Sequence, residues 1–403
     1  MMGQRGICAI VLLAASACTE SGEVLHAGDG AAGAATAGSG GSPPVVLHES
    51  EVRLSTGQMH ACSVNSGVLS CWGQDSDGQL GVEASDNATG RGPVVVAGGN
   101  WLVPAAGEGH TCALTNDGNV SCWGANDLGQ LGAGDRMASA KPRAVTLPAA
   151  AIDLRTSFNH SCALLADASL WCWGANVEGQ LGLGDRYPGE DQPSPVQVGS
   201  ARDWVFVAAG QGHSCGIRSP GALYCWGRNT ESQLGQGGAE PQQIRTPTRV
   251  GTDSDWLEVA LGQGTSCARK RDKTLYCWGK MASGVLAVGD IEGRTTPTRV
   301  PDFSDWSSLA SATFHTCGLR GAAEIWCAGR NTEGQIGREE LLDANPSMRQ
   351  ADPSPNWLEV RTGRFFTCAR KADNSVWCMG GNREHELGQD VAIDHSAAML
   401  RVP

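Results

Sequence analysis

The sequence predicts an all-β fold, a seven-bladed β-propeller whose blades are four-stranded antiparallel sheets with a disulfide inside each blade. Three observations lead to it. A segment of about 50 residues repeats up to residue 403, a cysteine pair stands at the same place in each repeat, and each repeat contains four short strand-like stretches. Short strands at such a period are typical of propellers, in which one repeat forms one blade.

The cysteine pairs mark the seven repeats. Fourteen of the 16 cysteines fall into pairs whose first members lie 50 to 53 residues apart. The remaining two, Cys8 and Cys18, precede the repeats. The pairs are Cys62 with Cys71, Cys112 with Cys122, Cys162 with Cys172, Cys215 with Cys225, Cys267 with Cys277, Cys317 with Cys327, and Cys368 with Cys378.

The spacing within a pair indicates a disulfide across a β-hairpin. In the second repeat a three-residue loop, 116–118, brings Cys112 opposite Cys122, and its final glycine suits the left-handed conformation that such loops need. We expect this to be a close, non-hydrogen-bonded pair with Cα atoms about 4.5 Å apart, within reach of a disulfide. The first repeat is one residue shorter, but the deletion falls in the turn, so Cys62 still faces Cys71.

The four strands of a blade can be placed in the fifth repeat. We expect them near residues 257–261, 266–269, 274–277 and 298–300. Because the blades close a ring, the first strand near Val52–Leu54 is expected to lie close to the final strand, Met399–Val402. The propeller is expected to cover residues 48–403, with no room for a second domain.

The N-terminal segment resembles an export signal. An arginine precedes the short apolar run Ile7–Ala17, which is too short to cross a bilayer and is typical of a signal peptide over residues 1–17. The run ends in Ala-Ser-Ala before Cys18, as in the bacterial lipobox, although Ala15 stands where that motif prefers leucine. We expect an exported protein, either an outer-membrane or cell-surface lipoprotein lipidated at Cys18, or a secreted one.

Composition limits the partners. Residues 18–47 are rich in Gly, Ala and Ser and are expected to form a flexible linker. The net charge of −12 disfavours nucleic acid, because acidic side chains repel phosphates. Metal binding by the cysteines is the alternative to disulfides, but their spacing is not that of zinc sites and no repeated residue completes a ligand set. We expect no metal, no cofactor, a monomer, and membrane contact only through a lipid at Cys18.

The repeat itself resembles a known family. The segment GHTCALTNDGNVSCWGANDLGQLGAGD, residues 109–135, is similar to the repeat of the regulator of chromosome condensation (RCC1) propellers, and the likeness covers about residues 50–403. The resemblance implies a seven-bladed propeller that binds proteins with a rigid disc. The eukaryotic founder is a nuclear exchange factor for a small GTPase, and a secreted bacterial relative inhibits β-lactamases by binding them. The export signal and the paired cysteines depart from the founder.

We therefore expect a protein-binding module rather than an enzyme, with an unidentified protein partner and no catalytic residues, since no catalytic motif stands in a confirming context. Two alternatives stay open. One is an extracytoplasmic enzyme or carbohydrate binder that uses the central funnel. The other is guanine nucleotide exchange, as in the founder.

Residues that recur in every blade indicate architecture, and departures from the repeat are candidates for function. A histidine precedes the first cysteine by two positions in five repeats, and the glutamine of the G-Q-L-G motif is expected to bind the backbone of a neighbouring blade. The departures are Thr265, Val285, Phe366, Met379 and Glu386.

Variable loops between G-Q-L-G and the last strand, such as 185–195 and 338–355, are the other candidates for binding. Drift of solvent-exposed loops is the alternative explanation of their variation. The candidate binding residues are Arg136, Arg186, Tyr187, Glu190, Asp191, Arg245, Arg294, Glu339 and Glu340.

Overall fold

The computed structural model describes residues 53–83, 92–280, 283–389 and 393–403, and they form a seven-bladed β-propeller. Each blade is a four-stranded antiparallel sheet, and the one described helix is a 3-10 turn, Gly184–Arg186. The signal peptide, the linker and Cys18 expected from the sequence lie outside the described residues. Within the described ranges, no helix has the length and apolar character to cross a membrane.

The blades follow one another along the chain, and each blade consists of four consecutive strands. Blade 1 contains β1 (Leu54–Thr56), β2 (His60–Asn65), β3 (Val68–Gly73) and β4 (Val94–Val96). Blade 2 contains β5 (Trp101–Ala106), β6 (His110–Thr115), β7 (Val120–Gly124) and β8 (Ser139–Val145). Blade 3 contains β9 (Ala151–Ser157), β10 (His160–Leu165), β11 (Leu170–Gly174) and β12 (Gln192–Gln197). Blade 4 contains β13 (Trp204–Ala209), β14 (His213–Arg218), β15 (Ala222–Arg228) and β16 (Gln243–Arg249). Blade 5 contains β17 (Trp256–Leu261), β18 (Thr265–Lys270), β19 (Leu275–Gly279) and β20 (Arg294–Arg299). Blade 6 contains β21 (Ser308–Ser311), β22 (His315–Arg320), β23 (Glu324–Gly329) and β24 (Arg349–Asp352). Blade 7 contains β25 (Trp357–Thr362), β26 (Phe366–Lys371), β27 (Val376–Gly381) and β28 (His395–Arg401).

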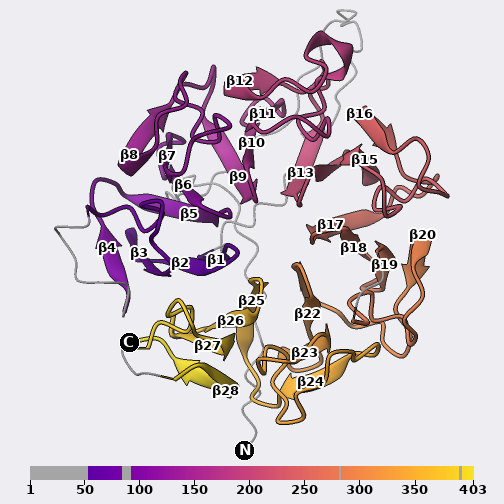
Figure 1. Ribbon diagram of the computed structural model, residues 1–403. Helices are drawn as coiled ribbons and strands as arrows, with labels where there is room; N and C mark the ends of the chain where they lie inside the picture. The colour runs from indigo at the N-terminus through magenta and orange to yellow at the C-terminus, as the bar shows by residue number, and fades with distance from the viewer. Residues whose placement is uncertain (1–52, 84–91, 281–282, 390–392) are drawn as a thin grey trace, which may run out of the picture. The chain divides into compact units, whose positions relative to one another are not determined.

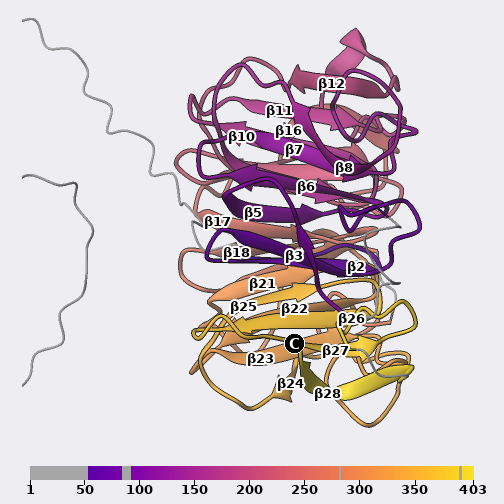
Figure 2. The ribbon, with the colours of Figure 1, turned by 90° about the vertical axis from the view of Figure 1, so that its left-hand side faces the viewer.

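The first strand of each blade lies at the centre of the ring and the fourth at the rim (Figure 1). Figure 2 shows the sheets from the side. Since the strands of a blade alternate in direction, the connections between strands 1 and 2 and between strands 3 and 4 emerge on the same face. We call this the loop face. The hairpins between strands 2 and 3 and the connections between blades emerge on the opposite face, the hairpin face.

The ring closes by packing of blade 1 against blade 7. Strand β1 contacts β25, the backbone N–H of Arg53 donates to Glu359 Oε2 over 3.2 Å, and Arg361 Nε donates to the carbonyl of Leu54 over 3.3 Å. The expected neighbour of the first strand was the final strand. The final strand, β28, pairs with β27 at the rim, so it does not pair with β1. Leu400 and the following Val402 nevertheless reach the hydrophobic cluster at the seam that contains Leu54, so the end of the chain lies close to the first strand as expected.

Each of the seven cysteine pairs forms a disulfide between the second and third strands of its own blade. The register places Cys112 opposite Cys122, with Gly118 in the left-handed region at φ +79°, and Cys62 opposite Cys71 across the two-residue turn. The Cα atoms of the pairs are 4.0–4.1 Å apart, somewhat closer than the expected 4.5 Å. The expected intra-blade disulfides are confirmed.

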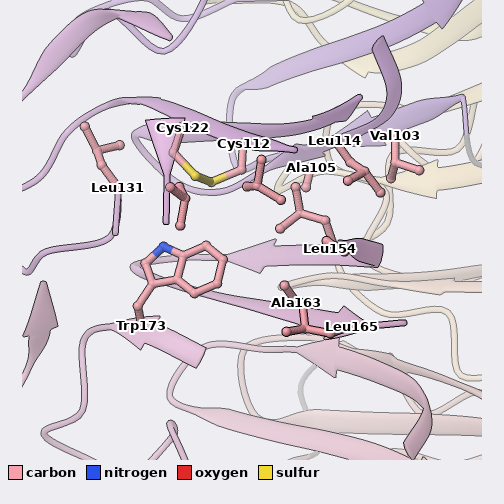
Figure 3. Close-up of a cluster of buried hydrophobic side chains, with 13 residues drawn as sticks. Val103, Ala105, Cys112, Leu114, Cys122, Leu131, Leu154, Ala163, Leu165 and Trp173 are labelled. Atoms are coloured by element: carbon pink, nitrogen blue, oxygen red, sulfur yellow. A yellow bond between two sulfur atoms is a disulfide. The ribbon is translucent and has the colours of Figure 1, made fainter. Parts of the chain in front are cut away.

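The hydrophobic core lies between blades. Figure 3 shows the interface of blades 2 and 3, where the Cys112–Cys122 disulfide packs with Leu131 of its own blade and with Trp173 and Leu154 of the next. All of these side chains are at most 1% exposed. An antiparallel sheet that buries both faces against neighbouring sheets is stable only within the ring, so the blades depend on one another.

Candidate functional site

The central channel is lined by the innermost strands and is narrow. Its volume is about 160 Å³, below the roughly 300–1,000 Å³ usual for small-molecule sites. The charged side chains that line it have partners: Glu258 accepts from Arg269 Nε over 3.0 Å, and Arg361 pairs with Glu359 over 2.8 Å. The described residues contain no group of three or more His, Cys, Asp or Glu side chains arranged to hold a metal ion.

The recurring histidines lie at the interfaces between blades. His60 Nε2 is 2.8 Å from Thr111 Oγ1 of the next blade, and that hydroxyl donates to the carbonyl of Gln79 over 2.8 Å. Because the hydroxyl hydrogen is used on the carbonyl, its oxygen accepts from Nε2–H, so Nε2 carries a proton. Burial lowers the pKa of His60 to about 4.

The same contact joins four further interfaces. The pairs are His110 with Ser161, His160 with Ser214, His213 with Ser266, and His315 with Thr367, at 2.7–3.1 Å. Burial lowers the pKa of His160 to about 4 and that of each of the other three to about 3. These histidines are architecture, as the recurrence predicted, although their role is an interblade hydrogen bond.

The glutamine side chains of G-Q-L-G were expected to bind the backbone of a neighbouring blade, but they bind within their own turn. The side chain of Gln79 accepts from the N–H of Asp77 in its own turn. The bonds to the next blade come from the main-chain carbonyl of Gln79, which accepts from Trp123 Nε1 as well as from Thr111. The side chain therefore shapes the turn and presents its carbonyl to the neighbour.

The five departures from the repeat, which the sequence offered as candidates for function, are buried and do not present a surface to a partner. Thr265, Val285, Phe366, Met379 and Glu386 are at most 3% exposed. At the seam of blades 7 and 1 the ring of Phe366 occupies the histidine position, and the residue at the hydroxyl position is Ala61, in the same hydrophobic cluster. The two polar partners are replaced together, which leaves no buried donor unsatisfied there.

The structure brings some of the predicted binding residues together. Arg136 Nη1 lies 3.5 Å from Asp191 Oδ2, which joins the loops of blades 2 and 3 on the loop face. The guanidinium of Arg186 lies over the ring of Tyr187 at 5.1 Å, and Glu190 is exposed beside them.

The other predicted residues are more scattered. Arg245 lies in β16 and Arg294 begins β20, so both are strand residues rather than loop residues. Glu339 and Glu340 are exposed in blade 6, where Glu340 pairs with Arg338 over 3.3 Å. The segments 185–195 and 338–355 are also partly strand, because β12 begins at Gln192 and β24 begins at Arg349.

Exposed apolar residues are the feature that the sequence did not single out. Among the described residues, five of the eight exposed large hydrophobic side chains lie in connections between strands 3 and 4, on the loop face. The five are Met137, Val177, Ile291, Leu341 and Leu342, which are 45–70% exposed. A comparison of the repeats position by position would have located these apolar residues in the loops. Their exposure could not be predicted in this way, because it depends on the conformation of each loop.

The loop that carries Met137 is held in place by its own blade. The Met137 carbonyl accepts from Asn126 and from Arg143, and its N–H donates to Asp135, which also pairs with Arg143 over 2.7 Å. An apolar side chain presented on an ordered loop can bind without first ordering that loop, which lowers the entropic cost of association.

Comparison with known proteins bears on both the fold and the site. The RCC1-like domain family matches residues 9–308 and 105–401. The Arabidopsis thaliana ultraviolet-B receptor UVR8 is 28% identical over 263 residues, 62% of this chain and 57% of the relative. The Caenorhabditis elegans homologue of the X-linked retinitis pigmentosa GTPase regulator is 29% identical over 276 residues, 57% of this chain and 20% of the relative. The chain thus spans less than two thirds of these relatives.

Solved structures share the fold. The structure of Prp20p from Saccharomyces cerevisiae has a TM-score of 0.74 at 23% identity and covers 86% of this chain and 87% of its own. Human WBSCR16 has a TM-score of 0.73 at 18% identity and covers 84% of this chain and 94% of its own. At these identities the likeness extends to the propeller and not to its ligands.

Proposed function

The chain belongs to the RCC1-like domain family, and on that premise we propose that it is an exported, lipid-anchored propeller that binds another protein through its loop face. The observation that carries the proposal is the concentration of exposed apolar side chains on that face. The five side chains lie on blades 2, 3, 5 and 6, so this face presents apolar side chains at several places around the ring. The small channel volume favours a surface contact over a ligand held in the funnel.

Protein partners also occur among the structural neighbours. The Prp20p structure was reported with its binding properties to Gsp1p and histones, and a second structure of this yeast RCC1 contains bound Kap60. Those partners belong to Prp20p. What transfers to this chain is the expectation that a propeller of this kind presents a rigid surface to a folded protein.

Export is supported by the cysteines. Seven disulfides would not persist in a reducing cytosol, and the apolar run before Cys18 supplies the signal. Mass spectrometry of the native N-terminus should find a start at lipidated Cys18, and a Cys18→Ser variant should leave the membrane fraction. An unmodified N-terminus at another residue would instead indicate plain secretion.

The binding face can be tested by placing a charge on it. The double substitution Met137→Asp with Val177→Asp should weaken partner capture from the surface fraction at least tenfold, about 1.4 kcal/mol, with little change in melting temperature. Val68→Asp is the matched control, because Val68 is a 50% exposed apolar residue on the hairpin face. Equal capture by both variants would place the interface elsewhere.

A further inference from the structure

We propose that the partner protein is held mainly by a surface on blades 6 and 7, and that this surface binds a partner loop in which an apolar side chain stands beside a carboxylate. The surface consists of Phe314, Phe365, Arg330 and Arg364, and we call it the aromatic ledge. This inference rests on the proposed function, since it names the part of the loop face where a protein partner is held and the chemistry of the segment that it recognises.

Two phenylalanines form the centre of the ledge. Phe314 lies between β21 and β22, and Phe365 between β25 and β26, so both belong to the loop face near the mouth of the channel. Their rings are stacked with centroids 5.2 Å apart and an interplanar angle of 22°. Both side chains are only partly buried, and neither belongs to a hydrophobic core cluster.

Guanidinium groups flank the rings. Arg330 Cζ lies 5.1 Å from the Phe314 centroid and 5.9 Å from the Phe365 centroid, and Arg364 Cζ lies 5.1 Å from that of Phe365. A guanidinium group in such a contact with a ring can still donate hydrogen bonds from its edge.

The architecture of the repeat does not require these rings. The position just before the histidine position is glycine in blades 2, 4 and 5, at Gly109, Gly212 and Gly264, asparagine in blade 3 and methionine in blade 1. The blades that carry glycine there have the same strands and disulfides as blades 6 and 7. Two adjacent blades therefore carry partly exposed aromatic rings at a place where smaller residues support the fold.

The arginines around the aromatic ledge differ in whether a carboxylate of the chain pairs with them. Arg330 pairs with Asp343 over 2.9 Å, and the nearby Arg383 pairs with Glu333 over 3.2 Å. Within the described part of the chain, no carboxylate forms an ion pair with Arg364. A partner carboxylate at Arg364 would thus find a cation whose charge no ion pair among the described residues neutralises.

An apolar rim extends the ledge. Leu341 and Leu342 are 45% and 54% exposed, and the carbonyl of Leu342 accepts from the N–H of Asn331, the residue after Arg330. Aromatic residues, phenylalanine included, and arginine are enriched at protein interfaces, and the two leucines add exposed apolar area beside them. The rings and leucines suit an apolar side chain, and Arg364 suits a neighbouring carboxylate through charge-assisted hydrogen bonds.

A short peptide can test this recognition on the full mature chain. The probe is an end-blocked hexapeptide, Gly-Leu-Phe-Asp-Glu-Gly, with its binding measured by saturation-transfer NMR and titration. We expect a dissociation constant near 1 mM, as for a small fragment of an interface. Replacing Asp-Glu by Lys-Lys, or Leu-Phe by Ala-Ala, should weaken binding at least fivefold.

The substitutions in the protein are chosen by comparing equivalent positions in different blades. Phe365→Gly introduces the residue that three other blades carry at this position, so it should fold while losing the peptide at least tenfold, and Arg364→Gln should lose it about fivefold. Arg228→Gln is the control for the loss of an arginine elsewhere on the propeller. Arg228 is the counterpart of Arg330 in blade 4, where no phenylalanine stands beside it, and its loss should leave peptide binding unchanged.

Several results would overturn the inference. Equal binding of the Lys-Lys peptide, or equal effects of Arg228→Gln and Arg364→Gln, would mean that the ledge has no such selectivity. A concentration-dependent dimer in sedimentation that Phe365→Gly abolishes would make the occupant a second copy of this chain. If Phe365→Gly leaves partner capture intact while the Met137 and Val177 substitutions abolish it, the proposed function stands and the ledge does not.

Discussion

At the scale of single residues, the histidine and the hydroxyl that face each other between blades are retained together at five interfaces and replaced together at the seam of blades 7 and 1, whereas in blade 5 Thr265 replaces the histidine alone and the facing Thr316 is kept. Wherever a histidine precedes the first cysteine, the facing blade supplies a serine or threonine hydroxyl. Where Phe366 replaces the histidine, Ala61 replaces the hydroxyl. A buried N–H without an acceptor costs about 1–3 kcal/mol, whereas an apolar pair of suitable shape costs little. This explains why departures from the repeat need not be functional.

The pairing predicts a double-mutant cycle at the interface of blades 1 and 2. Thr111→Ala should lower the free energy of unfolding by about 1–3 kcal/mol, because it leaves His60 Nε2–H without an acceptor. Adding His60→Phe should recover most of the loss. The His60 ring packs against Gly57 in the same way as the Phe366 ring packs against Gly363. A phenylalanine ring at position 60 would therefore have the same glycine beside it as Phe366 has. Urea denaturation of the four proteins measures the coupling, and additive losses would contradict it.

The same histidines predict sensitivity to acid. Their pKa values in the folded protein, about 3 to 4, lie below the usual 6.5 of the unfolded chain. Between pH 6.5 and about 4 the unfolded state binds more protons, so the free energy of unfolding falls as the pH falls. The double variant at residues 60 and 111 should reduce this slope by one proton, about 1.4 kcal/mol per pH unit. Parallel pH profiles of the two proteins would argue against buried neutral histidines.

Glu386 gives a prediction of opposite sign. It occupies the glutamine position at the seam of blades 7 and 1, where its main-chain carbonyl accepts from Trp72 Nε1 over 2.9 Å. Burial raises the pKa of its carboxyl, and Glu384 and Glu333 add to the rise. Its proton therefore stabilises the folded state in acid, and this contribution is lost as the pH rises through the folded pKa.

Glu386→Gln should consequently stabilise the protein by about 1 kcal/mol at pH 7, since glutamine fits this position in five other blades. The gain should shrink as the pH approaches 4. Calorimetry from pH 4 to pH 8 measures the difference in melting temperature. The expectation fails if the variant is less stable at pH 7 or if the gain grows in acid.

At the scale of elements, the sequence was sufficient for the strands. The four strands expected in the fifth repeat overlap β17, β18, β19 and β20, because turn residues and the cysteine register fix a hairpin locally. The placement of Arg245 and Arg294 was not predictable in the same way. Both follow loops whose length varies between blades, so the start of the outer strand depends on packing against the preceding blade. Arg245, for example, packs against Gly179 of blade 3.

Disulfide removal tests the hairpin as a unit. Replacing Cys215 and Cys225 together by alanine should lower the free energy of unfolding by about 2–3 kcal/mol, the value for a loop of about ten residues in the chain-entropy account. The same pair of changes at Cys112 and Cys122 should cost a similar amount, because the two loops have the same length. Non-reducing peptide mapping of the parent protein is the check on connectivity, and a peptide that links two blades would refute it.

At the scale of the whole molecule, seven blades could be counted from the repeat, but the closing contact could not be assigned. The repeat period predicts that the first and last blades meet, but it does not predict which of their strands are in contact. The structure shows face-to-face packing of β1 on β25, the arrangement used between all other neighbouring blades. The aromatic ledge was also beyond prediction, because Phe314 and Phe365 are 51 positions apart and become neighbours only when blades 6 and 7 pack.

The central claim is that a protein partner binds the loop face. It is tested most directly by site-specific photo-crosslinking in cells that produce the protein, with a photoreactive residue at Val177 or Arg364 on the loop face and at Asp117 or Lys273 on the hairpin face. We predict one discrete protein adduct from the loop-face positions and none from the hairpin-face positions. An adduct only from Asp117 or Lys273 would contradict the account, and so would the absence of an adduct at all four positions.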